Sequence, residues 1–319
     1  MDRGSGSGST LAGILYGAGA GALWGLVFLG PELARGFSPL ELTIGRYLLF
    51  GLISAMLIAP RWRKLAPGLD RQAWIGLTWL AVAGNTLYYI LLSTAVQKGG
   101  IAMTSLVVGF VPIAVTIVGS RAFGAVPLGR LAPSLLLCAA GAICIGWQAI
   151  ALPASGSVGT QLVGLLAAIG ALVSWTAYAV GNSRWLARLR HISAHEWNLL
   201  IGLTTGAQSL LLIPLALMLA EGRHGAADWA RFAAVSIAVC LAGSIFGNAF
   251  WNRMNRLLPL TLVGQMILFE TLFALIYGFL WENRLPTALE MAAFALLVLS
   301  LLSCIAAHRK PGARLSEAG

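Results

Sequence analysis

Glu270 is the residue with the clearest chemical potential, because it lies inside an apolar stretch, residues 259–279, that is long enough to cross a membrane. About eleven residues of helix place its carboxyl about 16 Å deep, where an ionised carboxylate costs at least about 2.5 kcal/mol. Such a group faces a partner or a wet cavity, or it holds a proton. Two interpretations stay open: a site for a substrate amine or a proton, or a structural carboxyl hydrogen-bonded between helices. Gln265 lies at a similar depth but about 140° away around the helix.

Amphipathic side chains also occur in the middle of other apolar stretches, away from the ends where aromatic belts form. They are Trp24, Asn85, Tyr88, Tyr89, Trp175, Tyr178, Asn248 and Trp251. Trp175 and Tyr178 are three residues apart and therefore share a helical face. A cavity lined by such rings and amides suits a solute with a flat apolar group and a polar head. For any single residue of this set, packing is an equally good explanation.

Other prominent acidic residues have a structural explanation. Three glutamates each follow a serine or threonine by three residues, the pattern of a capping box at a helix start. The pairs are Ser38–Glu41, Ser193–Glu196 and Thr287–Glu290. His195 and Glu196 also begin like a zinc-protease helix, but Leu199 stands where the second histidine would be. We therefore expect no metal site and no cofactor.

Enzymatic chemistry is disfavoured for a related reason. The histidines lie in loops or at the ends of apolar stretches, and no set of serine, histidine and aspartate is evident. They are His191, His195, His224 and His308. We assign no catalytic residue and expect that the protein is not an enzyme. A membrane-embedded acyltransferase or protease is the alternative from a different class.

The elements that must position these side chains are membrane helices. Of the 319 residues, 58% are apolar and only 10% are charged, whereas a soluble domain carries about a quarter charged residues. Ten stretches are apolar over the roughly 20 residues that a crossing helix needs. They are residues 10–29, 40–60, 73–95, 101–121, 131–150, 161–182, 196–220, 230–252, 259–279 and 287–307. The sequence therefore predicts an all-α integral membrane protein with ten transmembrane helices.

Local features add detail to these spans. We expect the first span to be retained rather than cleaved as a signal peptide. Its glycines at positions 13, 17, 21 and 25 recur every four residues and predict a face for close helix packing. Pro112 removes a backbone hydrogen bond in the middle of the fourth span and predicts a kink that could act as a hinge. The four cysteines lie in apolar runs, which indicates packing rather than disulfides.

Basic residues indicate how the chain is oriented. With a cytoplasmic N-terminus, 15 of the 21 lysines and arginines lie on the inner side, in agreement with the positive-inside rule. The outer side then keeps Arg35, Arg46, Lys98, Arg223, Arg231 and Arg284. We expect both termini in the cytoplasm, and we interpret the net charge of +10 as a topology signal rather than as nucleic-acid binding. No lysine or arginine is expected at mid-span, which disfavours a substrate that bears phosphate.

The two halves of the chain match one another. Matching pairs include Trp24 with Trp175 at an offset of 151 residues, Gly51 with Gly206 at 155, and Gly84 with Gly243 at 159. Their consistent order predicts a duplication, with repeats at residues 1–154 and 155–319. Because five spans is an odd number, the second repeat must be inverted, an arrangement that supports alternating access around a substrate site near the midplane. A duplicated bundle that only scaffolds partners is the simpler alternative.

The order of these features resembles the drug/metabolite transporter superfamily, in its ten-helix branch of two EamA-type repeats. The residues that carry the resemblance are the segment GAGAGALWG with Trp24, Phe110-Val111-Pro112, Leu280-Trp281-Glu282 and Pro286. The resemblance covers about residues 10–307, and residues 269–274 are most similar to bacterial exporters of aromatic amino acids. It implies a central cavity between the first, third, fourth, sixth, eighth and ninth spans. The chain departs from the family pattern at Glu270, where proline is common, and at Phe123, where an acidic residue is common.

The function expected from these observations is export of aromatic and other large apolar amino acids, such as tryptophan, phenylalanine and tyrosine, across the bacterial inner membrane. The expected contacts to the apolar group are Trp24, Tyr88, Tyr89, Trp175 and Tyr178, and Trp251 joins the same cavity. The candidates for the zwitterionic head are Asn85, Asn248, Gln265 and Glu270. A carrier for another small metabolite or a drug is the alternative within transport. We expect a monomer or a weak homo-oligomer, and the energy source stays open between facilitated diffusion, exchange and proton antiport.

Overall fold

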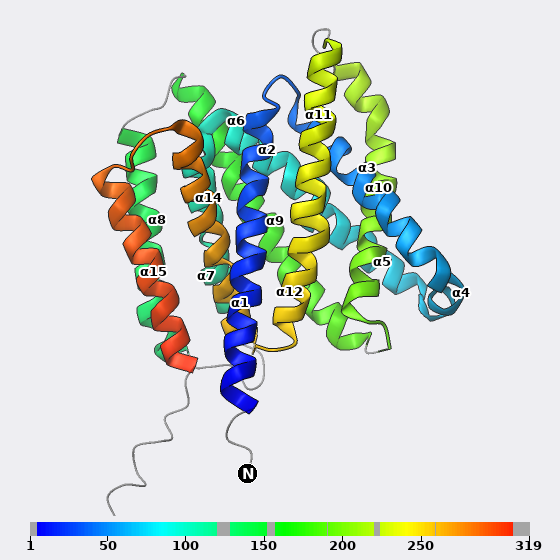
Figure 1. The fold of residues 1–319 in the computed structure, drawn as a ribbon, viewed down its shortest axis with the longest axis horizontal. Coiled ribbons are helices and arrows are strands. Elements are labelled where there is room, and N and C mark those ends of the chain that lie inside the picture. The colour runs from blue at the N-terminus through cyan, green and yellow to red at the C-terminus, as the bar shows by residue number, and fades with distance from the viewer. Residues whose placement is uncertain are drawn as a thin grey trace, which may run out of the picture.

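The computed structural model describes residues 5–119, 128–151, 157–189, 191–219, 224–258 and 260–308, and every regular element in these ranges is a helix. The first half contains α1 (Ser5–Gly25), η1 (Leu26–Leu29), α2 (Gly30–Leu33), α3 (Pro39–Ile58), η2 (Ala59–Arg61), α4 (Trp62–Leu65), η3 (Ala66–Gly68), α5 (Arg71–Ala81), η4 (Val82–Thr86), α6 (Leu87–Val108), α7 (Val111–Gly119) and α8 (Leu128–Ala151). The second half contains α9 (Val158–Arg188), α10 (Ala194–Leu219), α11 (Ala226–Val239), η5 (Cys240–Gly247), α12 (Asn248–Asn255), α13 (Leu260–Met266), α14 (Leu268–Glu282) and α15 (Ala288–His308). The predicted all-α fold is confirmed, and the helices form one bundle (Figure 1).

The described helices account for the ten predicted passes across the membrane. Six segments are long and apolar enough to span it. One of them, Arg71–Val115, holds two passes, because α6 leaves the helical conformation at Gly100 (φ 82°, ψ 167°) and the chain turns there. The helix α8, the pair α13–α14 and the helix α15 provide the other three. The start of α1 and the end of α15 lie at the same end of the bundle, as an even number of passes requires (Figure 1).

The predicted capping boxes are present at the starts of α3, α10 and α15. The Ser38 N–H donates to the Glu41 carboxylate (2.7 Å), and the Glu41 N–H donates to Ser38 Oγ (3.2 Å). The same reciprocal bonds join Ser193 with Glu196 and Thr287 with Glu290. These glutamates therefore satisfy helix ends, and their position sets the depth of every residue that follows in each helix.

The glycine face of α1 packs inside the chain, against α12, α13 and α14. A Cβ on Gly21 would lie 2.7 Å from the backbone nitrogen of Glu270, and a Cβ on Gly25 would lie 2.9 Å from that of Ala274. No side chain larger than hydrogen fits at this separation, so the two backbones are in direct contact. The glycines thereby place the first turn of α14, with Glu270, directly against α1.

Contacts between equivalent residues reveal the symmetry of the two repeats. A Cβ on Gly51 in α3 would lie 2.6 Å from the Cα of Gly206 in α10, and the reverse distance is also 2.6 Å. Trp24 and Trp175, the pair predicted at an offset of 151, also touch, with ring centroids 6.3 Å apart. A residue that meets its own equivalent lies on a two-fold axis. Both contacts therefore mark the axis that relates the inverted repeats, while the predicted boundary at residues 154 and 155 lies outside the described residues.

Two widened helical segments occupy equivalent positions in the third and eighth passes. Both η4 and η5 are π-helical, and they overlap at the offset of 159 that pairs Gly84 with Gly243. Each segment makes a turn with one residue too many for an α-helix, which redirects side chains and leaves carbonyl groups for other partners. No local sequence pattern indicates this geometry, because glycine and alanine are frequent throughout the chain.

The fourth and ninth passes are both broken in the middle. The fourth ends one helix at Val108 and starts α7 at Val111, so Pro112 lies in the first turn of α7, where its missing N–H costs no helical bond. The buried carbonyl of Gly109 accepts a hydrogen bond from the Cys138 thiol (3.5 Å). The ninth pass is broken between α13 and α14, at Ile267. The predicted interruption of the fourth pass is present, at residues 109 and 110, but the predicted cause is wrong, because Pro112 removes no helical hydrogen bond at the start of α7. A hinge at this position stays a prediction.

Candidate functional site

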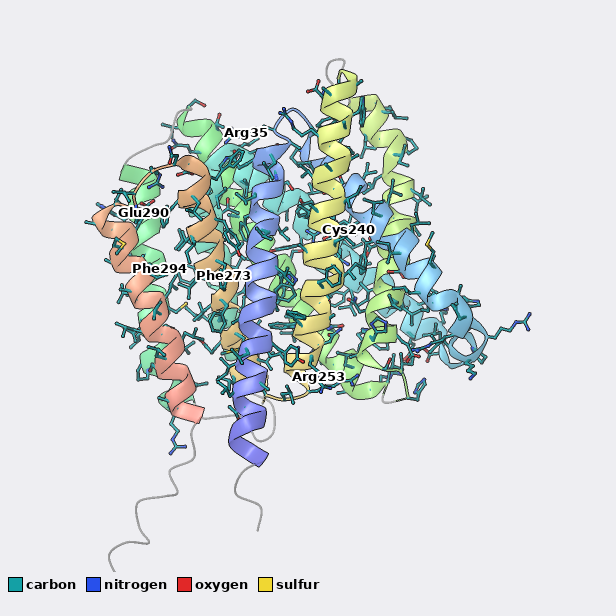
Figure 2. All side chains as sticks on the ribbon, in the orientation of Figure 1. Arg35, Cys240, Arg253, Phe273, Glu290 and Phe294 are labelled. Carbon is teal, nitrogen blue, oxygen red and sulfur yellow. The ribbon has the colours of Figure 1, made fainter. Side chains whose placement is uncertain are left out.

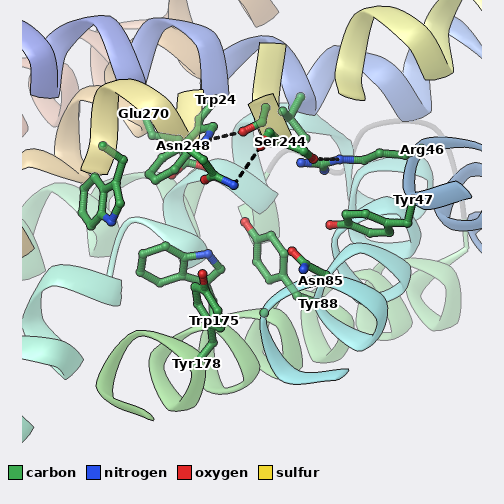
Figure 3. Close-up of a pocket in the computed structure, with 14 residues that line it drawn as sticks. Trp24, Arg46, Tyr47, Asn85, Tyr88, Trp175, Tyr178, Ser244, Asn248 and Glu270 are labelled. Atoms are coloured by element: carbon green, nitrogen blue, oxygen red, sulfur yellow. Dashed lines mark hydrogen bonds between the residues drawn. The ribbon is translucent and has the colours of Figure 1, made fainter. Parts of the chain in front are cut away.

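A cavity lies between the repeats, beside the two-fold axis marked by Trp24 and Trp175 (Figure 3). It is lined by Trp24, Val27, Arg46, Tyr47, Gly84, Asn85, Tyr88, Trp175, Tyr178, Gly243, Ser244, Asn248, Trp251 and Glu270. These residues come from α1, η1, α3, η4, α6, α9, η5, α12 and α14. The volume open to a water-sized molecule is about 50 Å³, which holds a few waters. Both repeats therefore contribute to one small site.

The widened segments are held by hydrogen bonds from the opposite repeat. The Trp24 indole N–H donates to the carbonyl of Gly243 in η5 (2.9 Å). In the other direction, the Ser174 hydroxyl donates to the carbonyl of Ala83 in η4 (2.7 Å). Each repeat thus uses its first helix to satisfy a carbonyl that the widened turn of the other repeat leaves free. These bonds position Asn85 and Ser244, which stand at equivalent places in the cavity wall.

Three indole rings form the aromatic part of the cavity wall. Trp24 and Trp251 have ring centroids 5.0 Å apart, and Trp175 lies 6.3 Å from each of them. Tyr178 extends the group, 6.0 Å from Trp175. Rings at these separations and tilts attract one another through their edges and faces. In this structure the rings therefore contact one another and fill the space that a flat apolar ligand would occupy.

The two asparagines of the cavity already use their amide groups as donors. Asn85 Nδ2 donates to Thr205 Oγ1 (2.9 Å), and Asn248 Nδ2 donates to Asn198 Oδ1 and to the Ser244 carbonyl (both 3.1 Å). These bonds tie the third and eighth passes to α10 and fix both side chains. The side-chain oxygen of each asparagine is then the atom that suits a donor on a ligand, such as an ammonium group.

Glu270 lines the cavity and is 7% exposed. It lies in the first turn of α14, just after the break at Ile267, where the positive end of the helix dipole favours a carboxylate. In the described part of the chain, no side chain forms an ion pair or a hydrogen bond with its carboxylate oxygens. The alternative interpretation, a structural carboxyl group hydrogen-bonded between helices, is therefore not supported by a hydrogen-bond donor among these residues.

Arg46 is a cavity residue that the sequence analysis placed wrongly. It is the eighth residue of α3, about 10 Å into the helix, and it is 7% exposed rather than lying in an outer loop. The expectation that no arginine lies near mid-span is therefore wrong, and the set of six basic residues predicted for the outer side loses one member. The capping box at Ser38 gave the signal that could have located it, because that box fixes where α3 begins. Arg35 and Arg253, expected on opposite sides, do lie at opposite ends of the bundle (Figure 2).

Aromatic faces hold the Arg46 guanidinium. Its central carbon lies 4.5 Å from the ring centroid of Tyr89 and 4.9 Å from that of Tyr47, the range of cation–π contacts. Its Nε donates to Ser244 Oγ (3.3 Å), while Nη1 is buried without a hydrogen-bond partner. A charged arginine at the centre of a helix in the membrane costs about 2.5–3.5 kcal/mol. The cavity lining thus includes two ionisable groups of opposite charge, the Arg46 guanidinium and the Glu270 carboxyl group.

Eight of the ten predicted binding residues line the cavity, and two do not. Tyr89 is 1% exposed and lies behind the wall, where it supports Arg46. Gln265 is fully buried on the far side of α13, where its Oε1 accepts from the Ser134 hydroxyl (3.4 Å). The cavity residues that the sequence analysis missed are Val27, Arg46, Tyr47, Gly84, Gly243 and Ser244. Within the described residues, the second pass (α3) contributes to the wall where the resemblance implied the fourth.

Comparisons with known proteins agree with this architecture. Residues 11–147 match the EamA-like transporter family. The chain is 29% identical over 329 residues to "Inner membrane protein YtfF" of Escherichia coli (strain K12), a match that covers 96% of this chain and 98% of that protein. It also superposes on a solved crystal structure with a TM-score of 0.62 at 19% identity, covering 96% of this chain and all of the other, which shows the fold alone. The first half of the chain is thus similar to the EamA-like transporter family, and the whole chain is similar to a protein of the inner membrane.

Proposed function

We propose that this chain is an inner-membrane transporter that exports aromatic and other large apolar amino acids from the cytoplasm by alternating access. The observation that carries the proposal is the cavity between the inverted repeats, in which three indole rings stand beside one arginine and one glutamate. The indoles suit a flat apolar side chain. The two ionisable groups and the asparagine oxygens suit a zwitterionic head.

The size of the cavity supports a mechanism in which the repeats move. About 50 Å³ is far too small for tryptophan or phenylalanine, so a substrate must part the indoles to enter. Because Trp24 and Trp175 come from different repeats and meet on the two-fold axis, a rocking of one repeat against the other separates them. Pro112 and the break at Ile267 are positions where the fourth and ninth passes can bend.

Counterflow tests the proposal directly. Purified protein in liposomes loaded with unlabelled tryptophan is expected to accumulate labelled tryptophan or phenylalanine, with saturation at rising concentration. The matched control is Trp229→Ala, which removes a tryptophan that is 50% exposed and outside the cavity. Saturable flux that Trp175→Ala reduces and Trp229→Ala retains supports the assignment. Absence of saturable flux for every amino acid, in either orientation, contradicts it.

Arg46 gives weight to a second candidate within transport, a carrier of another small metabolite. Its buried guanidinium supplies the positive charge that a phosphate or carboxylate group needs, which the sequence analysis had not expected in the cavity. A substrate panel for counterflow should therefore include phosphorylated metabolites beside amino acids. Flux of such a compound in place of any amino acid would favour the second candidate.

We infer that both termini face the cytoplasm, that the repeats divide near residues 154 and 155, and that the protein works as a monomer or a weak homo-oligomer. The orientation is supported by the basic residues, whose excess on the inner side grows once Arg46 is removed from the outer loops. A monomer is supported by the glycine face of α1, which is used inside the chain rather than offered to a second copy.

A further inference from the structure

Arg46 is a buried cation whose hydrogen-bonding capacity is incomplete. A guanidinium has five N–H donors in a fixed plane. Nε is used by Ser244, whereas Nη1 is buried and has no partner. Among the residues that the structure describes, none offers a carboxylate in an ion pair with it. A group from outside the chain would complete this site.

The surroundings of Arg46 hold its plane in one orientation. The rings of Tyr47 and Tyr89 contact the guanidinium, and the Ser244 hydroxyl fixes Nε. The Nη2 side lies against η5, because a Cβ added to Gly243 would come 2.7 Å from that nitrogen. Any larger residue than glycine at position 243 would displace the guanidinium. The group is therefore preorganised in the cavity wall rather than free to fold back on itself.

Arg46 and Glu270 are the two charged residues of the cavity lining. Figure 3 shows Arg46 beside Tyr47 on one side of the cavity and Glu270 beside Trp24 and Asn248 on the other. One positive and one negative group match a zwitterion with one anionic and one cationic group, whereas a phosphate dianion would bring excess negative charge into a buried site. The planar fork of arginine matches a carboxylate with two parallel hydrogen bonds.

We propose that Arg46 binds the carboxylate of the transported molecule and orients it, with the carboxylate at α3 and the apolar ring among Trp24, Trp175 and Trp251. This inference deepens the proposed function, on which it rests for the identity of the ring. It assigns to Arg46 the discrimination between carboxylates and their neutral or cationic analogues. Ser244 is a positioning residue, since it acts through Nε of Arg46.

A binding assay tests the assignment without relying on flux. Thermal unfolding of the purified full chain, in chloride-free buffer, is followed at rising concentrations of indole-3-propionate and of indole-3-propionamide. The two probes share ring and shape and differ in the carboxylate. We expect the wild type to bind the carboxylate at least about tenfold more tightly than the amide. Arg46→Gln should abolish that preference, Arg46→Lys should restore part of it, and Arg63→Gln, at an exposed arginine of α4, should leave it unchanged.

Two further arms keep the result decisive. If Arg46→Gln does not fold, Ser244→Ala keeps the charge but frees Nε, and it should reduce the carboxylate preference several-fold while binding of the amide stays the same. The proposal is overturned if the wild type binds both probes equally, if Arg46→Gln keeps the preference, or if chloride stabilises the protein as strongly as the carboxylate does. Carboxylate preference that depends on Arg46 in a protein without tryptophan flux would refute the proposed function alone. Tryptophan flux with no such preference would refute this inference alone.

Discussion

Alanine at Gly51 should destabilise the protein, because this glycine meets its own equivalent on the two-fold axis. The new Cβ would lie 2.6 Å from the Cα of Gly206. Ordinary contacts of this kind need close to 1 Å more, so α3 and α10 would have to separate along their shared face. Overpacking of a tight contact costs about 1–3 kcal/mol. The intrinsic gain of alanine over glycine in a helix is about 1 kcal/mol, so we expect a net loss of up to about 2 kcal/mol.

The double variant sharpens this prediction. Gly206→Ala alone should cost about as much as Gly51→Ala, because the two positions are related by the axis. Both methyl groups together enter the same gap, so the combined loss should exceed the sum of the single losses. Thermal unfolding in one detergent measures the effect as a fall of several degrees in the midpoint. Gly129→Ala is the control, since a Cβ at that exposed site of α8 meets nothing within 4 Å. The contact between equivalent residues would be refuted if the single variants had the same unfolding midpoint as Gly129→Ala. It would also be refuted if the loss of stability in the double variant equalled the sum of the two single losses.

Three further predictions concern the cavity and its orientation. Glu270→Gln should fold at least as well as the wild type, because it removes a buried charge. It should lower aromatic amino-acid flux or change the pH dependence of that flux. An unaltered flux profile would assign Glu270 to a structural role. Trp24→Phe keeps an aromatic ring but loses the bond to the Gly243 carbonyl, and it should cost about 1 kcal/mol in unfolding measurements. Trp62→Phe, at an exposed position of α4 between the second and third passes, should cost less. Equal losses would argue against the role of that bond. Tags at the two ends of the chain should both be reached from the cytoplasm, and tags on opposite sides of the membrane would contradict an even number of passes.

The parts of the fold that follow from local rules could be predicted from the sequence. Ten passes follow from the length of apolar stretches, and the starts of α3, α10 and α15 follow from capping boxes. The pair Trp24 and Trp175 follows from the repeat, and the structure brings the two rings together on the axis. Most of the cavity lining was predicted because polar and aromatic side chains are rare in the middle of a span.

The errors arise from what depth alone does not determine. Tyr89 and Gln265 are at the predicted depth, but each points to a face of its helix away from the cavity, and only the packing of neighbouring helices sets that face. Arg46 was missed because it was counted as a loop charge instead of being placed by the register of α3. The π-helical segments η4 and η5 shift the helical register of the third and eighth passes by one residue, which no pattern of alanines and glycines reveals.

The two charged groups of the cavity do not obey the symmetry that builds it. Arg46 corresponds to Ile201 in the second repeat at the offset of 155, and Glu270 corresponds to Val111 in the first at 159. An antiparallel homodimer of five-helix chains would have to place two arginines and two glutamates in this space. Joining the copies into one polypeptide allows each half to carry a single, different charge, so the inward-open and outward-open forms are chemically unequal. Such an inequality lets a carrier hold its cargo with different strength on its two sides.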